Sequence, residues 1–403
     1  MKRNVRLKIE DPVIVAQGGI GDTAWGHTQF PRLRKTGDGG IYIEWEYGSD
    51  SVNYDAVDYG AVSHDGGKSW ERTAESTPLC GHEMKNGKGF LGFLKKGVYE
   101  APYFKKYSPV YRSRLYGETD IFLASDIKEN DAKGVFGTEI ELESGRRETF
   151  ECTVEQENMS IGLCGGGRVY PSTQFFALAN NNGILSDGGD LYCATYGNGL
   201  KAGAETREEL IPDYPNAYSV FVYKSEDSGR TWRYLSQIDV DSETDNVSGR
   251  RWFEGFCEPT LRKMKDGSFM MLMRTGSRHP MYVTYSCDGC ITWSKPEIFD
   301  EIGVYPQLLR LSEDVTLASY GRPELRVRAS CDGSGREWSE PIRVPLTNDG
   351  DADFKKISCF YTGLIALDES TALLAYSDFA YPNKDGIGVK TILTRRIHVI
   401  LED

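Results

Sequence analysis

Three residues that can move protons or attack a bound molecule stand at matching places in the sequence. Glu258, Tyr305 and Tyr361 each lie where an apolar, strand-like segment begins. A carboxylate beside such a segment is costly to bury unless a hydrogen bond or an opposite charge partners it, so its presence needs an explanation. We therefore expect these positions to face a ligand. The corresponding places in two further segments hold Gln29 or Phe30 and Ser172.

The segments that carry these residues repeat one pattern: an extended run, a turn and a second extended run. Apolar alternation and β-rich composition predict strands throughout. Units this small cannot bury their own apolar faces, so several of them must pack together, as in a β-propeller of four-stranded blades. The copies span 30–48, 172–197, 258–276, 305–321 and 361–378, and a sixth is expected near 100–126.

A second motif, S-x-D-x-G-x-x-W, also recurs along the chain. In the first copy, Ser63 and Asp65 have short side chains that can bond backbone N–H groups of their own turn, and Gly67 can take a positive φ. Trp70 would then wedge between neighbouring sheets. Cys290 replaces the glycine of the third copy, which predicts a strained or differently shaped turn. The copies are 63–70, 225–232, 286–293 and, with one residue inserted, 330–338.

These four loops resemble the Asp boxes of the sialidase and BNR-repeat superfamily, and the resemblance covers essentially the whole chain. It implies one domain, residues 1–403, with an all-β fold: a six-bladed β-propeller of four-stranded antiparallel blades. In that superfamily the loops lie at the blade periphery, away from the catalytic face. Their aspartates are therefore expected to be structural, and the Asp box also occurs in propellers that are not enzymes.

The resemblance extends to residues that carry out catalysis in sialidases. The stretch FCEPTLRKMKDGSFMMLMR is similar to the sialidase segment with the catalytic glutamate, an Asp-Gly turn and an arginine, which correspond to Glu258 and Arg274. The stretch YTGLIAL is similar to the segment that holds the tyrosine nucleophile, which corresponds to Tyr361. Arg322 matches, by position, a second carboxylate-binding arginine.

The chemistry of a sialoside accounts for this set of residue types. A sialic acid carries a carboxylate on its anomeric carbon, which would repel a carboxylate nucleophile but not a neutral tyrosine. Because tyrosine has a pKa of about 10, it needs a neighbouring base, which Glu258 would supply. Arg274 and Arg322 would hold the substrate carboxylate through planar, charge-assisted hydrogen bonds.

A separate acid must protonate the leaving oxygen. In the superfamily this acid is an aspartate in the loop after the first inner hairpin, which here has the sequence GSDSVNYDAVDYG. We expect Asp55 to be this acid, with Asp50 as the second choice. Asp58 lies close enough to the next strand for a structural role.

The sequence departs from the sialidase pattern where the first two arginines are expected. The position of the first arginine of the carboxylate-binding triad holds Gln29, and the next family arginine corresponds to Gly48. Arg32 or Arg34 would have to substitute, and strand alternation places at most one of them on the right face. Losing one arginine would weaken carboxylate capture, because charged hydrogen bonds contribute about 1.5–3 kcal/mol each. The substrate could therefore differ from a standard sialoside.

The leading hypothesis is an exo-glycosidase that removes a terminal, sialic-acid-like sugar with retention through Tyr361. One alternative is a propeller glycosidase for another sugar, such as arabinose, a uronic acid or rhamnose, that uses Glu258 with an aspartate of 50–58. The other is a catalytically silent carbohydrate-binding propeller, which Gln29 and Gly48 favour. Taken singly, Glu258 could also hold a backbone turn, and Tyr361 could fill a core.

Charge and composition exclude several classes of partner. The 403 residues carry a formal net charge of −13, which argues against nucleic-acid binding and leaves a glycan or small saccharide as the expected partner. The sequence shows no signal peptide and no membrane-spanning run, so we expect a cytoplasmic protein whose nine cysteines are reduced. We expect no metal or cofactor, since the five histidines are scattered and the C-x-x-C of Cys287 and Cys290 lacks a second ligand pair. The sequence does not predict the oligomeric state.

Overall fold

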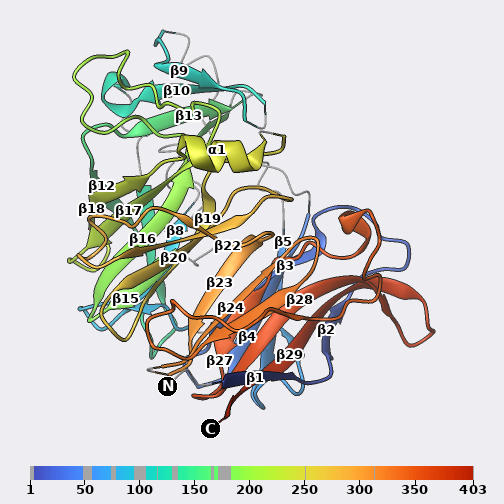
Figure 1. Ribbon diagram of the computed structural model, residues 1–403. Coiled ribbons are helices and arrows are strands. Elements are labelled where there is room, and N and C mark those ends of the chain that lie inside the picture. The colour runs from blue at the N-terminus through green and yellow to red at the C-terminus, as the bar shows by residue number, and fades with distance from the viewer. Residues whose placement is uncertain are drawn as a thin grey trace.

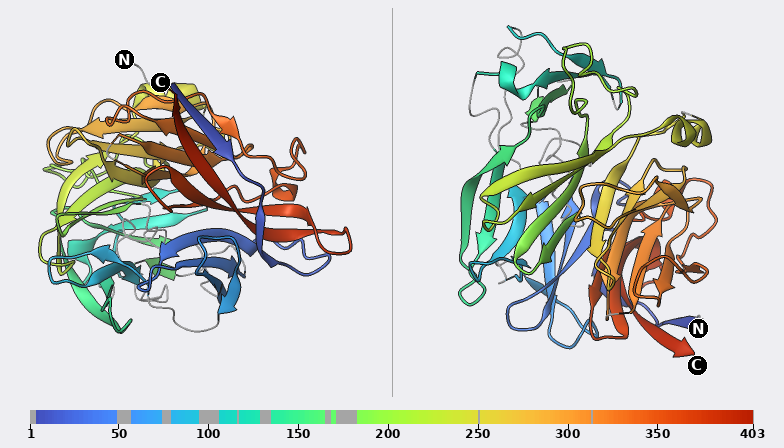
Figure 2. Two further views of the ribbon diagram at one scale, coloured as in Figure 1. Left: turned by 90° about the horizontal axis from the view of Figure 1, so that it is seen from below. Right: turned by 60° about the vertical axis from the view of Figure 1, so that its left-hand side comes forward.

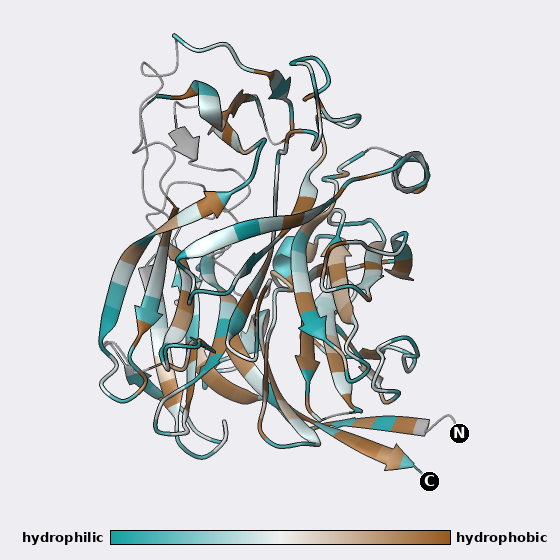
Figure 3. Cartoon of the chain, turned by 90° about the vertical axis from the view of Figure 1, so that its left-hand side faces the viewer, coloured by the Kyte–Doolittle hydropathy of each residue, from teal (hydrophilic) through white to brown (hydrophobic). Residues whose placement is uncertain are grey.

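The computed structural model describes residues 4–48, 57–73, 79–94, 106–115, 117–128, 135–164, 168–170, 183–249, 251–312 and 314–402, and its fold is all-β (Figure 1). The helical elements that it describes are short: α1 (Ser242–Ser248), η2 (Ala124–Asp126) and η5 (Phe354–Lys356). Within these ranges, no helix combines the length and the apolar character that a membrane crossing requires. Apolar and polar residues alternate along many of the strands, as Figure 3 shows.

Three four-stranded antiparallel sheets each follow the chain in order, so each is a meander of local hairpins. In each of them the first strand forms one edge of the sheet. Their first hairpins coincide with the predicted repeats at 30–48, 258–276 and 305–321. The strands are β3 (His27–Lys35), β4 (Ile41–Tyr47), β5 (Val57–Ser63) and β6 (Glu71–Thr73); β19 (Cys257–Lys263), β20 (Phe269–Arg274), β21 (Met281–Ser286) and β22 (Glu297–Asp300); and β23 (Val304–Arg310), β24 (Thr316–Gly321), β25 (Arg326–Ser330) and β26 (Ile342–Arg343).

The two ends of the chain meet in a fourth sheet (Figure 1). Its strand order is β1-β29-β28-β27, and β2 also pairs with β29. The whole of β1 pairs antiparallel with the end of β29, from Asn4 opposite Glu402 to Ile9 opposite Ile397. Between these joined ends, the sheets follow one another around the molecule (Figure 2). The strands are β1 (Asn4–Ile9), β2 (Val13–Gln17), β27 (Gly363–Ala366), β28 (Thr371–Pro382) and β29 (Gly388–Glu402).

The largest sheet has eight strands and consists of two antiparallel meanders joined edge to edge. The join is a short parallel pairing of β12 with β18, from Thr153 opposite Thr231 to Glu155 opposite Arg233. One meander contains β7 (His82–Glu83), β8 (Gly89–Leu94), β11 (Val135–Ile140) and β12 (Arg147–Glu155). The other contains β15 (Ile184–Asp187), β16 (Asp190–Gly197), β17 (Ser219–Ser225) and β18 (Thr231–Ile238).

The strand, turn and strand predicted near 100–126 are present within the described residues, as β9 and β10. The two strands pair with each other, but they belong to a separate sheet of order β14-β13-β10-β9. Leu200 and Leu210, from the segment after β16, pack against Tyr111 and Ile121 of this sheet, so it has a small core of its own. The strands are β9 (Tyr111–Ser113), β10 (Thr119–Leu123), β13 (Ser160–Cys164) and β14 (Arg168–Tyr170).

The hairpin β7–β8 resembles the first hairpins of the four-stranded sheets. Its turn repeats the backbone hydrogen bond of the β19–β20 turn, because Met84 N–H donates to Lys88 O just as Met264 N–H donates to Ser268 O. The sequence did not predict this hairpin, because β7 is only two residues long, which leaves too little alternation for a strand pattern to be seen.

At the hairpin turns, polar contacts join the edge strand of one sheet or meander to the edge strand of the next. We call this end of the edge strands the turn end. The contacts are Cys80 N–H to Lys35 O at 2.9 Å, Ser186 Oγ to Glu83 O at 2.5 Å, Lys263 Nζ to Asp187 Oδ2 at 2.6 Å, and Arg310 Nη1 to Lys263 O at 3.5 Å.

The S-x-D-x-G-x-x-W loops link the last two strands of their meanders, and the predicted contacts of serine and aspartate with the turn are present. Ser63 Oγ accepts a hydrogen bond from Gly67 N–H at 2.8 Å, and Asp65 Oδ1 accepts one from Lys68 N–H at 2.9 Å. Related contacts occur in the other three copies. Cys290 takes a φ of 71°, close to the 83° of Gly67, so the third loop keeps the same backbone turn at the cost of strain.

Candidate active site

The candidate site lies where three edge strands begin, and the same backbone feature shapes each of them. Phe30, Glu258 and Tyr305 have φ values of 55°, 46° and 47°, and each directly precedes a proline. The strand register shifts at all three positions. Such bulges re-aim a side chain, and a non-glycine residue at positive φ costs about 1–3 kcal/mol, which the surrounding structure must offset. In each of the three sheets, the bulge therefore redirects one side chain at an equivalent position: Phe30, Glu258 and Tyr305.

Tyr361 lies just before β27 and is held by aromatic rings. Its ring stacks on Tyr305 with centroids 4.1 Å apart and an interplanar angle of 12°, and it meets the Phe30 ring edge-on at 5.0 Å. Its hydroxyl donates a hydrogen bond to Glu258 Oε1. Three edge strands thus fix the position of this phenol.

Glu258 is a buried carboxylate, 8% exposed, whose two oxygens both have donors. Oε2 accepts the backbone N–H of Tyr305 at 2.8 Å, and Oε1 accepts Arg274 Nη1 at 2.7 Å in addition to the Tyr361 hydroxyl. Each oxygen of the carboxylate is therefore directed toward a partner from another strand, and the side chain has a fixed orientation.

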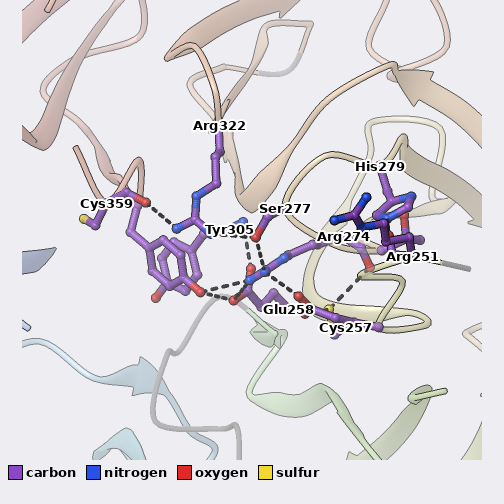
Figure 4. A network of polar contacts seen from close by, with 12 residues as sticks. Arg251, Cys257, Glu258, Arg274, Ser277, His279, Tyr305, Arg322 and Cys359 are labelled. Atoms are coloured by element: carbon purple, nitrogen blue, oxygen red, sulfur yellow. Dashed lines mark hydrogen bonds and ion pairs between the residues drawn. The ribbon is translucent and has the colours of Figure 1, made fainter. Parts of the chain in front are cut away.

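Arg274 ends β20 and lies between two carboxylates (Figure 4). Its Nη1 contacts Glu258 and the Tyr361 hydroxyl, the latter at 3.1 Å, while its Nη2 donates to Glu254 Oε1 at 2.8 Å. Burial by itself would lower the pKa of Arg274, but Glu258 and Glu254 outweigh it and hold that pKa well above its ordinary value. Arg274 is therefore permanently charged, and its guanidinium lies beside the Tyr361 hydroxyl.

Arg322 approaches the same place from the end of β24, with a φ of 68°. Its Nη1 donates to Ser277 Oγ at 2.8 Å and its Nη2 to Cys359 O at 2.9 Å, and its guanidinium lies over the Phe354 ring at 4.4 Å. Ser277 Oγ also accepts Arg274 Nη2 at 3.3 Å, so one hydroxyl lies between the two guanidinium groups (Figure 4).

In the described part of the chain, no ion pair compensates the positive charge of Arg322. Arg322 is only 6% exposed, and this burial, followed by the positive charge of Arg274, lowers its pKa. In the ranges that the structure describes, no carboxylate lies within ion-pair distance of Arg322. A carboxylate brought by a ligand would supply this missing partner.

Tyr361 is the member of this cluster that remains accessible. It is half-buried, whereas Glu258, Arg274 and Tyr305 are buried beneath it. Burial, and then the negative charge of Glu258, raise the pKa of Tyr361 well above its ordinary value. The phenol is therefore protonated, and its proton points at the carboxylate that could accept it.

Five of the residues chosen from the sequence come together here: Tyr361, Glu258, Arg274, Arg322 and Tyr305. Arg32 does not join them, because its Nε donates to Glu44 at 2.9 Å and its Nη1 to Glu46 at 2.8 Å within its own sheet. Gln29 is fully buried, and its amide has no hydrogen-bond partner in the described part of the chain. Asp50 and Asp55 lie outside the described residues, as does Ser172.

Sequence reasoning missed Glu254 and Ser277, which hold the two arginines in place. Both lie in irregular segments next to strands, where no periodic pattern marks them. One signal was present: Glu254 stands in the aromatic stretch WFEGF, and a carboxylate among apolar residues requires a partner.

Comparison with known proteins gives matches to family and fold. A family model described as a BNR repeat-like domain matches residues 167–383. A Dyadobacter fermentans protein of unknown function is 15% identical with a TM-score of 0.64, over 98% of this chain and 99% of that one. A Hadza microbial sialidase is 14% identical with a TM-score of 0.49, over 94% of this chain and 66% of that one.

A Penicillium chrysogenum alpha-L-arabinanase complexed with arabinobiose is 11% identical with a TM-score of 0.47, over 96% of this chain and 98% of that one. No curated protein matches the sequence. At these identities, the likeness to the Dyadobacter fermentans protein shows a shared fold.

Proposed function

The chain belongs to the BNR repeat-like domain family, and from this premise we propose that it is a glycoside hydrolase that removes a terminal sugar with retention of configuration. The observation that carries the proposal is the hydrogen bond from the Tyr361 hydroxyl to Glu258, beside Arg274. A nucleophile needs an adjacent base when its own pKa is high, and this pair meets that need.

The proposal includes a six-bladed propeller, which the sheet topology supports. Three sheets are four-stranded meanders, and the path β1-β29-β28-β27 makes a fourth set of four strands that joins the two ends of the chain. The eight-stranded sheet supplies two more meanders of four strands. On this interpretation, the sheet of β9, β10, β13 and β14 is an insertion, and the candidate site lies on the side where the edge strands begin.

In the first chemical step, the Tyr361 oxygen bonds to the anomeric carbon of the sugar while the glycosidic bond breaks. Glu258 takes the phenol proton, and Arg274 stabilises the negative charge that develops on the phenol oxygen. A second acid gives its proton to the leaving oxygen; we propose Asp55 for this role, with Asp50 as the second choice.

In the second step, water attacks the anomeric carbon of the glycosyl-tyrosine intermediate. The acid of the first step now acts as a base and takes a proton from the water, and Tyr361 leaves and regains its proton from Glu258. Two successive displacements at one carbon give net retention.

The substrate that we propose first is a terminal sugar with a carboxylate, held by Arg322. Among the described residues, Arg322 is the arginine of the site without a carboxylate partner, so a ligand carboxylate would compensate its charge. Arg274 has less to offer a ligand, because Glu254 and Glu258 already share it. That sharing, together with Gln29 at the position of the first family arginine, favours a neutral terminal sugar as the second candidate.

A panel of fluorogenic glycosides tests the proposal: sialosides, uronides, arabinosides and rhamnosides, each with the wild type and with Tyr361→Phe and Glu258→Gln. Turnover that both variants abolish supports the tyrosine mechanism. Tyr234→Phe, a half-buried tyrosine of β18, is the matched control and should keep full activity. A glycoside that Tyr361→Phe hydrolyses at the wild-type rate would rule the mechanism out, and no turnover on any substrate would favour a carbohydrate-binding propeller.

A further inference from the structure

A second set of basic side chains lies on the same edge strands, near their turn end rather than at the end that forms the candidate site. The second residue before the turn is Arg34 in β3, His82 in β7 and Arg262 in β19. The three positions are equivalent in register, because each is the last strand pair but one before its turn. The repeat therefore places three basic side chains at one level of the fold.

Backbone contacts place the start of β7 beside the end of β3, and electrostatics relates His82 to both arginines. Cys80 N–H donates to Lys35 O at 2.9 Å, and Thr36 forms a β-bridge with Leu79, so the chain entering β7 runs beside the end of β3. Burial, followed by the positive charges of Arg262 and Arg34, lowers the pKa of His82 to about 3. The imidazole therefore lies within electrostatic range of both guanidinium groups.

The positive charge of Arg262 lacks matching negative charge in the described part of the chain. Arg262 makes one recorded hydrogen bond, to Leu261 O of its own strand at 2.6 Å, and burial lowers its pKa to about 10. In the described ranges, no carboxylate lies within ion-pair distance of Arg262. Arg34 Nε is 3.8 Å from Glu44 Oε1, but Arg32 binds the same oxygen more closely, at 2.9 Å. Arg34 thus shares Glu44 with Arg32, which also pairs with Glu46 at 2.8 Å, whereas no described carboxylate serves Arg262.

An ion from solvent can reach this place. The first five residues of β19 are buried, whereas Arg262 and Lys263 at its end are half-buried, and β23 shows the same change over its last two residues. A partly buried guanidinium without a counter-ion is less favourable than an exposed one, so an anion that binds here gains more than it would on the surface. Because the whole chain carries a net charge of −13, anion binding also requires such a local concentration of positive charge.

We propose that Arg34, His82 and Arg262 bind a small inorganic oxyanion, phosphate or sulfate, at the turn end of the edge strands. The two guanidinium groups can each present a planar pair of N–H donors to a tetrahedral oxyanion, and the imidazole can donate a further hydrogen bond. The anion would join three edge strands from different meanders, and because it binds only the folded chain, it would stabilise the fold. This site is independent of the proposed glycosidase activity.

Calorimetric titration of the wild-type protein with inorganic phosphate tests the proposal directly. We expect saturable binding of one phosphate per chain, and a Tm that is at least about 2 °C higher in about 10 mM phosphate than in chloride of equal ionic strength. Sulfate should act like phosphate. If phosphate does not bind saturably to the wild type, the proposal is wrong, whatever the variants show.

Three variants locate the bound anion. Arg262→Met keeps an unbranched side chain without the charge and should weaken phosphate binding at least tenfold. Arg233→Met removes an exposed arginine of β18 and should leave the phosphate affinity unchanged. Arg322→Met removes a guanidinium of the candidate active site and should also keep phosphate binding. The opposite pattern, with binding lost in Arg322→Met and kept in Arg262→Met, would assign the anion to the candidate active site and contradict the proposal.

Discussion

Replacing Glu254 with glutamine tests whether Arg274 needs two carboxylates to hold Glu258 in place. The contact between Arg274 Nη2 and Glu254 Oε1 is 2.8 Å long, and both residues are buried, at 6% and 7% exposed. At an effective dielectric constant near 20, two charges at this separation attract by about 6 kcal/mol, most of which offsets the cost of desolvating them. Glutamine keeps an acceptor oxygen and loses the charge, so the free energy of unfolding should fall by about 1.5–3 kcal/mol.

The same substitution should slow catalysis. Without the charge of Glu254, Glu258 is the one carboxylate that pairs with Arg274, and the ion pair between them becomes stronger. A carboxylate in a stronger ion pair accepts the proton of Tyr361 less readily. We expect kcat to fall by about 10- to 100-fold, which corresponds to about 1.4–2.7 kcal/mol, with a smaller change in KM.

Urea unfolding and steady-state kinetics of Glu254→Gln measure these two effects. Glu155→Gln is the matched control, because Glu155 pairs with Arg233 at 3.0 Å on the surface, with both side chains more than half exposed. The control should lose no more than about 0.5 kcal/mol. If Glu254→Gln is as stable as the control and turns over substrate at the wild-type rate, the account of Arg274 as a residue positioned by two carboxylates is wrong.

Two further predictions concern the fold. Because the pKa of His82 is about 3 in the folded chain and about 6.5 when unfolded, the unfolded state takes up the proton first as pH falls, and stability is lost between about pH 6.5 and 3. Urea unfolding at pH 7 and pH 5 without phosphate should show His82→Gln losing about 2 kcal/mol less than the wild type, and equal losses would refute this. Gly67→Ala puts a Cβ 2.9 Å from Leu373 at a φ of 83° and should cost about 2 kcal/mol in urea unfolding, whereas Gly39→Ala, at 85° with no atom within 4 Å, should cost about 1 kcal/mol. Equal costs would show that contact with Leu373 does not matter.

The sequence predicted those parts of the structure that recur. The interval between Glu258 and Arg274 is set by one hairpin, in which Arg274 pairs with Cys257, the residue before Glu258. A repeated hairpin keeps that interval, so the resemblance to the sialidase segment was enough to place the two residues together. Tyr361 was found in the same way, as the equivalent position of another repeat.

What the sequence did not predict lies in irregular segments or depends on contacts between sheets. Glu254 and Ser277 follow no period, and their roles appear only when Arg274 and Arg322 approach from different sheets. The sequence offered Arg32 as a substitute for a missing arginine, but its guanidinium donates hydrogen bonds to two glutamates of the next strand. Cross-strand ion pairs of this kind depend on register, which the apolar pattern does not specify at polar positions.

The central claim is that Tyr361 is the nucleophile, and trapping the covalent intermediate tests it most directly. A fluorinated glycosyl fluoride of the sugar that the panel identifies should accumulate as a glycosyl-enzyme, which peptide mass spectrometry can locate. The account predicts one adduct per chain, on the peptide that contains Tyr361, and none with Tyr361→Phe. An adduct on Glu258 or Glu254, or turnover of the same sugar without any adduct on Tyr361, would contradict it.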